Sequence, residues 1–212
     1  MTIKATSALS ILAIWVTMIP AVAVNPDAWW SLIFAFLGTC AIGASAWRRI
    51  GLSRVIAIAG TWAGTAIAIG ADSDNAWISI FAFLTTGAVV YSVMRRSALL
   101  SGAGIAVAWL VVGIVLAATG HPGGAWIAIF AFLTAGAVAN YRGTGGRGVA
   151  AIVWWCIAGI LMLAGGGGGW FALSIAAFLL STASLGFAEF RLPRRIEWDV
   201  LDRDDDDAHY VG

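Results

Sequence analysis

Charge is what this sequence has least of. Only 11% of its 212 residues are Asp, Glu, Lys or Arg, whereas 61% are hydrophobic, and the formal net charge is +1. Soluble domains carry roughly 25% charged residues, so this chain lacks the polar groups that would cover a water-facing globule. The small net charge excludes a nucleic-acid-binding protein, and the presence of only two cysteines excludes a disulfide scaffold. An integral membrane protein remains.

The few charges are separated by long uncharged segments. Eight segments of 17–21 residues cover about 6–24, 28–47, 55–71, 76–94, 98–118, 125–141, 148–164 and 169–188. At 1.5 Å per residue, such helices match a hydrocarbon core of roughly 30 Å. Barrel strands are about 10 residues long and alternate apolar with polar side chains, unlike these segments. The sequence therefore predicts an all-α integral membrane protein, with eight transmembrane helices in 1–188 and a cytoplasmic acidic tail over 189–212.

The basic residues predict the orientation of these helices. All 12 Lys and Arg residues lie at the N-terminus, in every second loop and in the C-terminal tail. The intervening loops carry Asp27, Asp72, Asp74 and His121, or a run of glycines, and no basic residue. Because loops rich in Lys and Arg stay on the cytoplasmic side, both termini are expected in the cytoplasm of a multi-pass protein of the cell membrane.

The first segment has a second interpretation. Lys4, the apolar run that follows it and the small residues 21–23 resemble a signal peptide with a cleavage site. Cleavage would leave seven helices. The first segment also matches later segments that are not signals, which favours its retention in the mature protein.

One two-helix unit occurs four times. Ile-Phe-Ala-Phe-Leu stands at 33–37, 80–84 and 129–133, and returns as Ile-Ala-Ala-Phe-Leu at 175–179. A tryptophan precedes each copy by 18 or 20 residues: Trp15, Trp62, Trp109 and Trp155. The sequence therefore predicts four parallel tandem hairpins, over about 6–49, 54–96, 98–142 and 147–191. Parallel repeats favour a ring-like, pseudo-fourfold bundle, with a linear row of hairpins as the alternative.

The four tryptophans fall near the middle of their helices, where the N–H of a buried indole needs a partner. They are interpreted either as packing anchors between hairpins or as a ring that lines a central cavity. Gly60 and Gly64 form a Gly-x-x-x-Gly step around Trp62, and small residues of this kind let membrane helices approach closely. A second tryptophan set is expected in the aromatic belt at the outer helix ends: Trp30, Trp77, Trp126 and Trp170.

Chemically reactive residues are missing from the membrane segments. No Asp, Glu, Lys, Arg or His lies inside any of the eight. Charges kept at mid-bilayer usually mark ion paths, proton relays or substrate sites, so their absence argues against a pump, a proton-driven transporter or an intramembrane enzyme. We predict no catalytic residue and no metal or cofactor site. The tail is either a docking segment for a cytoplasmic partner or a solvated acidic end, and its candidate residues are Trp198, Asp204, Asp205, Asp206 and Asp207.

The paired helices and their tryptophans resemble the SPW-repeat family of small membrane proteins. Residues 60–62, Gly-Thr-Trp, resemble the Gly-x-Trp element of that family, and the spacing from Trp15 to Pro20 resembles its Trp-to-Pro spacing, although no Ser-Pro-Trp tripeptide occurs. The resemblance implies a membrane location and no known activity.

The sequence thus leads to a non-enzymatic polytopic membrane protein with a structural, accessory or scaffold role. Its expected partners are the lipid bilayer and other membrane subunits or a cytoplasmic protein at the tail, and not nucleic acid. One alternative is a passive channel or carrier for a small neutral or apolar solute through the bundle. Another is a sensor that passes changes in the bilayer to the tail. The side chains at the centre distinguish the first two, because a passage needs an open lumen and a scaffold has a filled one.

Overall fold

The described part of the chain is built from helices. The structure, a computed structural model, describes residues 3–45, 50–92, 99–120, 126–140, 146–164 and 172–180. Its helices are α1 (Ile3–Val24), α2 (Ser31–Ala44), α3 (Leu52–Ala71), α4 (Ile78–Tyr91), α5 (Leu99–Thr119), α6 (Ile127–Ala139) and α7 (Gly146–Ala164), with a further helix over 172–180 and the short 3-10 helices η1 (Pro26–Ala28) and η2 (Ser73–Trp77). No strand occurs within these ranges, so the all-α prediction is confirmed.

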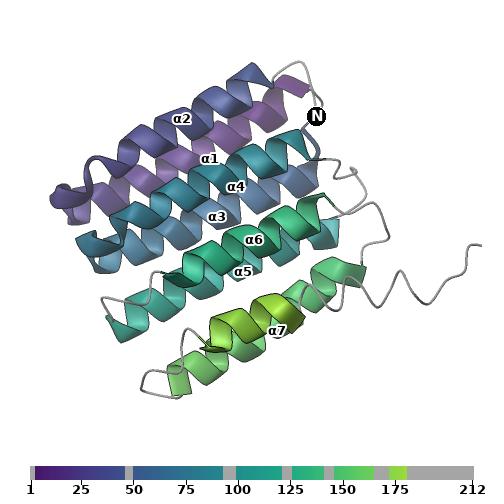
Figure 1. The fold of residues 1–212 in the computed structure, drawn as a ribbon. Helices are drawn as coiled ribbons and strands as arrows, with labels where there is room; N and C mark the ends of the chain where they lie inside the picture. Colours follow the sequence, from purple (N-terminus) through teal and green to yellow (C-terminus); the bar gives the residue numbers. More distant parts are fainter. Residues whose placement is uncertain are drawn as a thin grey trace, which may run out of the picture.

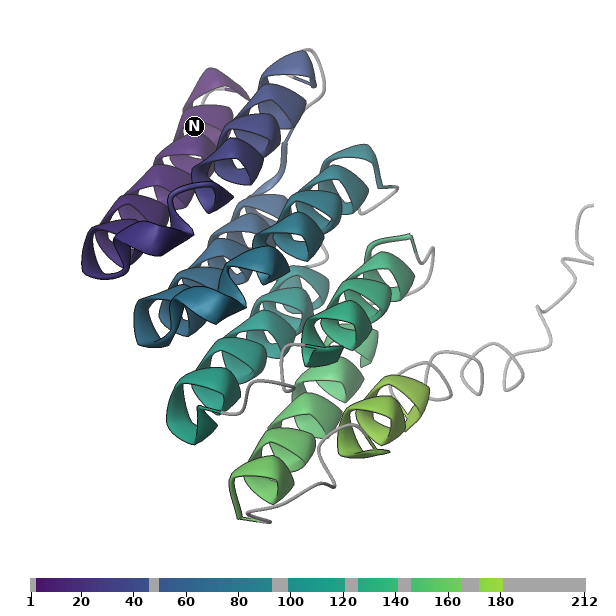
Figure 2. The same cartoon turned by 60° about the vertical axis from the view of Figure 1, so that its left-hand side comes forward.

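The helices form two layers, each of which is a row. The odd-numbered helices α1, α3, α5 and α7 lie side by side in this order, and α2, α4 and α6 lie over them in the same order (Figure 1). The turned view in Figure 2 shows the same order, with α1 and α7 at opposite ends and the helix over 172–180 beside α7. Of the two arrangements that the sequence allows, the described helices therefore adopt the linear row.

The small residues of α5 explain why the layer is a row and not a ring. A Cβ atom on Gly102 would meet backbone atoms of Ser53 in α3, whereas one on Gly104 would meet Gly148 in α7. Two residues along an α-helix are about 200° apart around its axis, so these glycines lie on opposite sides of α5. Helices that pack on opposite sides of a third helix lie in one plane with it, whereas a ring of four needs neighbours near a right angle.

Within the described ranges, three helices are long and apolar enough to cross a membrane. They are Ala5–Val24 within α1, Leu52–Ala71 and Leu99–Thr119. Twenty residues of α-helix span about 30 Å, the thickness of the hydrocarbon core. The sides of α1 and α7 that end the row also expose large aliphatic side chains, among them Val16 (61%) and Ile160 (66%). These features support the expected membrane location of the helical bundle.

The even-numbered helices are shorter than the segments predicted for them. α2, α4 and α6 contain 14, 14 and 13 residues. Before α2 the chain forms η1 with Pro26 at its start, and before α4 it forms η2, where the carboxylate of Asp72 accepts a hydrogen bond from the backbone N–H of Asp74 at 2.9 Å. At the other end of α4 the backbone of Ser92 is extended. Proline and side-chain-bonded aspartate favour turns over continued helix, which hydropathy alone does not register.

Two asparagine side chains cap the end of α3. The amide of Asn25, which follows α1, donates to the carbonyl oxygens of Ile69 and Gly70 at 2.6 and 3.0 Å. The amide of Asn75 in η2 donates to the carbonyl oxygen of Ala68 at 3.1 Å. The last carbonyls of an α-helix have no partner within the helix, so these amides satisfy them. The bonds from Asn25 also tie the first hairpin (α1 and α2) to the second (α3 and α4).

Candidate functional site

The two glycines singled out in the sequence lie where α3 packs on α5. A Cβ atom on Gly60 would overlap Ala106, and one on Gly64 would overlap the backbone carbonyl of Trp109. The contact is matched from the other helix, because a Cβ on Gly113 would overlap the carbonyl of Gly64. The two backbones therefore touch directly, which is the close packing that small residues permit between membrane helices.

The next pair of odd-numbered helices uses the same device. A Cβ atom on Gly148 of α7 would overlap the backbone of Leu100 and Ser101 in α5. A Cβ on Gly159, eleven residues further along α7, would lie 2.8 Å from a methyl of Val111. Close backbone contact thus continues along the odd layer from α3 to α7.

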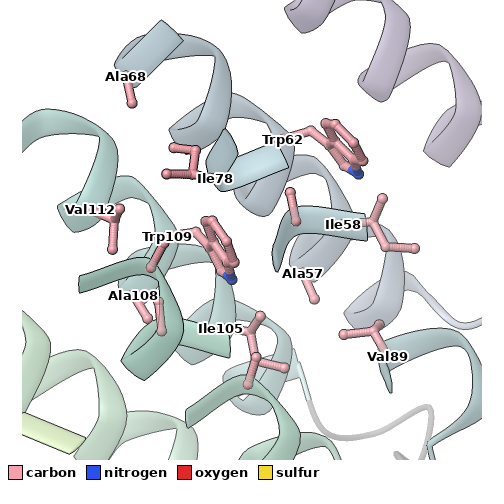
Figure 3. Close-up of a cluster of buried hydrophobic side chains, with 14 of the residues drawn as sticks. Ala57, Ile58, Trp62, Ala68, Ile78, Val89, Ile105, Ala108, Trp109 and Val112 are labelled. Carbon is pink, nitrogen blue, oxygen red and sulfur yellow. The ribbon is translucent and has the colours of Figure 1, made fainter. Parts of the chain in front are cut away.

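The four mid-helix tryptophans are spread along the odd layer, one on each helix. Trp62, Trp109 and Trp155 are fully buried, and Trp15, on the end helix α1, is half-buried. In Figure 3 the rings of Trp62 and Trp109 lie in the same orientation, with both nitrogens to the same side, among aliphatic side chains such as Ile58 and Ile105. In a row these rings surround no common centre.

A threonine hydroxyl accepts the indole N–H in the first two hairpins. Trp15 Nε1 donates to Thr39 Oγ1 at 3.1 Å, and Trp62 Nε1 donates to Thr86 Oγ1 at 2.9 Å. Each hydroxyl in turn donates to the backbone carbonyl four residues earlier, at 3.0 and 2.9 Å. The tryptophan is therefore satisfied by its own hairpin. The interval from tryptophan to threonine is 24 residues in both hairpins.

The later tryptophans depart from this pattern. Trp155 Nε1 donates to Thr134 Oγ1 at 3.2 Å, across to α6 of the preceding hairpin. Trp109 Nε1 is buried and has no hydrogen-bond partner, and neither has the buried hydroxyl of Thr85 on α4. An unpaired buried donor costs free energy, so these two atoms mark an irregular position among the tryptophan–threonine pairs.

Removal of the hydroxyl that joins α6 to α7 is expected to weaken that seam. Thr134→Val keeps the shape of the side chain and leaves the N–H of Trp155 unpaired, so we expect a loss of about 1 kcal/mol in unfolding free energy. Detergent unfolding of the purified protein measures it. In the control, Thr17→Val, the lost hydroxyl bonds only to carbonyls of its own helix. Equal effects of the two variants would show that the bond between the helices contributes nothing.

Aromatic rings join the even-numbered helices through one recurring contact. In each case the first phenylalanine of one pentapeptide meets the second phenylalanine position of the next, with rings tilted by 43° and centroids 6.0–6.4 Å apart: Phe34 with Phe83, Phe81 with Phe132, and Phe130 with Phe178. The ladder ends at each side of the row. Phe36 is 57% exposed at one end, and the position that would continue the ladder at the other is Ala176.

The outer-end tryptophans extend this layer. Trp77 lies between Phe81 and Trp126, with ring centroids 5.7 and 5.9 Å away, and Trp126 is 57% exposed. This position agrees with an aromatic belt, where one face of the indole packs and the other meets the headgroups. Trp170 lies outside the described residues.

The described residues contain no group of three or more His, Cys, Asp or Glu that could hold a metal ion. Cys40 and Cys156 are free and exposed on α2 and α7. The buried polar side chains in this part of the chain belong to Ser, Thr and Asn. The tail candidates lie outside the described residues: Trp198, Asp204, Asp205, Asp206 and Asp207.

Comparison with known proteins found no match among protein-family models, curated proteins or solved structures. The fold defines the class to which the chain belongs, a helical-bundle membrane protein with a tightly packed interior. The contacts between the helices of this chain are therefore the basis for proposing a function.

Proposed function

We propose that this chain is a non-enzymatic, multi-pass scaffold protein of the membrane, in which four tandem hairpins form a finite row. The observation that carries the proposal is the apolar, uncharged interior of the described residues. The described core consists of Trp, Ala and aliphatic side chains, and the polar groups buried with them are Ser, Thr and Asn. A path for ions or protons through a membrane protein needs charged or water-filled positions, which these described residues do not supply.

The recurring contacts support four copies of one unit. The phenylalanine contact occurs three times at the same 43° tilt. The tryptophan–threonine bond occurs at the same interval in the first two hairpins. Copies related by translation make the same contact to each neighbour, so a repeated contact is what tandem repeats produce.

The chain path supports eight crossings. Each even-numbered helix packs along its odd partner and leads the chain back to the end from which the next odd helix begins (Figures 1 and 2). If α1, α3 and α5 cross in one direction, the helices between them return the chain. With Lys and Arg confined to one side of the membrane, both termini lie in the cytoplasm.

The ends of the row support a finite assembly. α5 and α7 each carry contact glycines seven residues before and four residues after the mid-helix tryptophan, and in α5 these are Gly102 and Gly113. The same positions relative to Trp15 in α1 are Ala8 and Ile19. Ile19 is 56% exposed, as is Leu12 one turn before the tryptophan. Bulky aliphatic side chains such as Ile19 and Leu12 block a close backbone contact and suit lipid chains, so this side of α1 acts as the cap that repeat proteins place on a terminal unit.

A flux assay separates the scaffold from a passive channel. Vesicles that contain the purified protein should take up water, glycerol and urea at the rate of protein-free vesicles, because the described core is apolar and carries no charge. Stopped-flow light scattering measures the rate, and vesicles with a water or glycerol channel show that the assay responds. A tenfold faster uptake of any of the three solutes would favour the channel and overturn the scaffold.

The scaffold role itself predicts a stable assembly in the native membrane. Protein extracted from native membranes in polymer nanodiscs should carry a second membrane protein at a fixed ratio, measured by native mass spectrometry. A variant that lacks residues 198–212 shows whether that subunit binds the helices or the tail. Particles that contain only this chain and lipid would contradict the proposal.

A further inference from the structure

We propose that one water molecule is bound beside Trp109, in the place that a threonine hydroxyl takes beside Trp15 and Trp62. The first observation is the unsatisfied donor. Trp109 is fully buried, and its Nε1 has no partner, although Trp15, Trp62 and Trp155 all donate to a threonine. Buried donors that lack a protein partner are usually satisfied by an internal water.

The second observation is the residue that replaces the threonine. The threonines that accept from Trp15 and Trp62 both stand two residues after the Leu of the pentapeptide, and the same position on α6 is Ala135. Ala135 is fully buried. Threonine exceeds alanine by a methyl and a hydroxyl group, about the share of liquid volume that one water takes, roughly 30 Å³. The substitution thus removes the acceptor together with a side-chain volume of about one water molecule.

The third observation supplies further partners for the water. The hydroxyl of Thr86 bonds to the carbonyl of Ala82 as well as to Trp62, and Ala131 is the equivalent of Ala82 on α6. The hydroxyl of Thr85 is buried and unpaired. Thr85 comes directly after the pentapeptide of α4, and Thr134 comes directly after the pentapeptide of α6. Because Thr134 accepts from the tryptophan of the following odd helix, this register turns Thr85 toward Trp109.

A water in this position accepts from Trp109 Nε1 and donates to the Ala131 carbonyl and the Thr85 hydroxyl. Three hydrogen bonds are typical of an internal water. The inference rests on the tandem register of the proposed scaffold, and it places a single polar point between the second and third hairpins.

Indole signals of the ¹⁵N-tryptophan-labelled protein in lipid nanodiscs test the site. The Trp109 signal, identified as the one lost in Trp109→Phe, should show a cross-peak to water, whereas the Trp62 signal should show none. Ala135→Thr supplies the missing hydroxyl and should abolish the Trp109 cross-peak. Thr86→Ala is the reciprocal variant and should create a water cross-peak at Trp62.

The outcomes separate the possibilities. A Trp109 signal without a water cross-peak would overturn the site, and a cross-peak that persists in Ala135→Thr would overturn its location. Should Ala135→Thr fail to fold, Thr85→Val serves instead, because it removes one partner without adding volume and should at least halve the cross-peak; an unchanged cross-peak would again overturn the site. These measurements are independent of the solute flux and of the native assembly, so a failure of the water site can be distinguished from a failure of the scaffold.

Discussion

Gly64→Leu is expected to force α3 and α5 apart. The first atom of the new side chain would overlap the backbone carbonyl of Trp109, and a helix backbone has no rotamer by which to move away. We expect a loss of at least about 3 kcal/mol in unfolding free energy, the upper range for overpacked cores. For a chain of this size that lowers the unfolding midpoint by roughly 6–12 °C. Thermal unfolding in detergent, followed by circular dichroism and size-exclusion chromatography, measures the loss.

Gly70→Leu is the matched control on the same helix. A Cβ atom on Gly70 meets nothing within 4 Å, and leucine favours helix more than glycine does. This variant should be as stable as the parent protein or slightly more so. If Gly64→Leu behaves in the same way, the direct backbone contact between α3 and α5 is wrong.

Trp62→Ala is expected to have the second large effect. The ring is fully buried, its N–H bonds to Thr86, and its edge lies close to Gly38 of the first hairpin, where a Cβ atom would be 3.2 Å from Cζ2. Truncation of a buried tryptophan leaves a cavity and costs about 3–5 kcal/mol. Unfolding of the purified variant with increasing denaturing detergent measures the change.

Two further variants assign this effect to its cause. Trp29, which is 63% exposed, gives the matched control Trp29→Ala, which should change stability little. Trp62→Phe keeps the six-membered ring and removes the donor together with part of the packed indole, so it should lose less than Trp62→Ala, about 1–3 kcal/mol. A loss for Trp29→Ala as large as that for Trp62→Ala would show that the position of the ring does not matter.

The sequence predicted the helical class and singled out two glycines on α3 that contact α5. A scarcity of charge and the length of the uncharged segments indicate membrane helices, and Gly60 and Gly64 stand where the backbones meet. The 3-10 turns before α2 and α4 were missed, because they start in the predicted loops, at Pro26 and beside Asp72 and Asp74, and continue into the first residues of the predicted segments. Local hydrogen bonds decide such boundaries.

The choice between ring and row was beyond a comparison of repeats. Repetition indicates that each hairpin has the same neighbours, but curvature depends on the angle between the two faces that it uses. In α5 that angle follows from Gly102 and Gly104, two residues apart, which contact α3 and α7 respectively. The angle between the two contact faces could be derived only once the helix that each glycine contacts was known. The unpaired Trp109 was missed for a similar reason, since only the contacts identify Ala135 as its missing acceptor.

Because the hairpins lie in a row, the contacts between them do not fix how many hairpins the protein contains. α3 and α5 each pack on the odd-numbered helices before and after them, and α1 and α7 lie at the two ends of the row. Insertion or loss of an internal pair of helices leaves every other pair in the same kind of contact with its neighbours. In a closed ring, the angles between all the pairs would have to change. A longer or shorter row is therefore compatible with the same kind of contact, provided that the exposed aliphatic side chains of α1 and α7 stay at its ends.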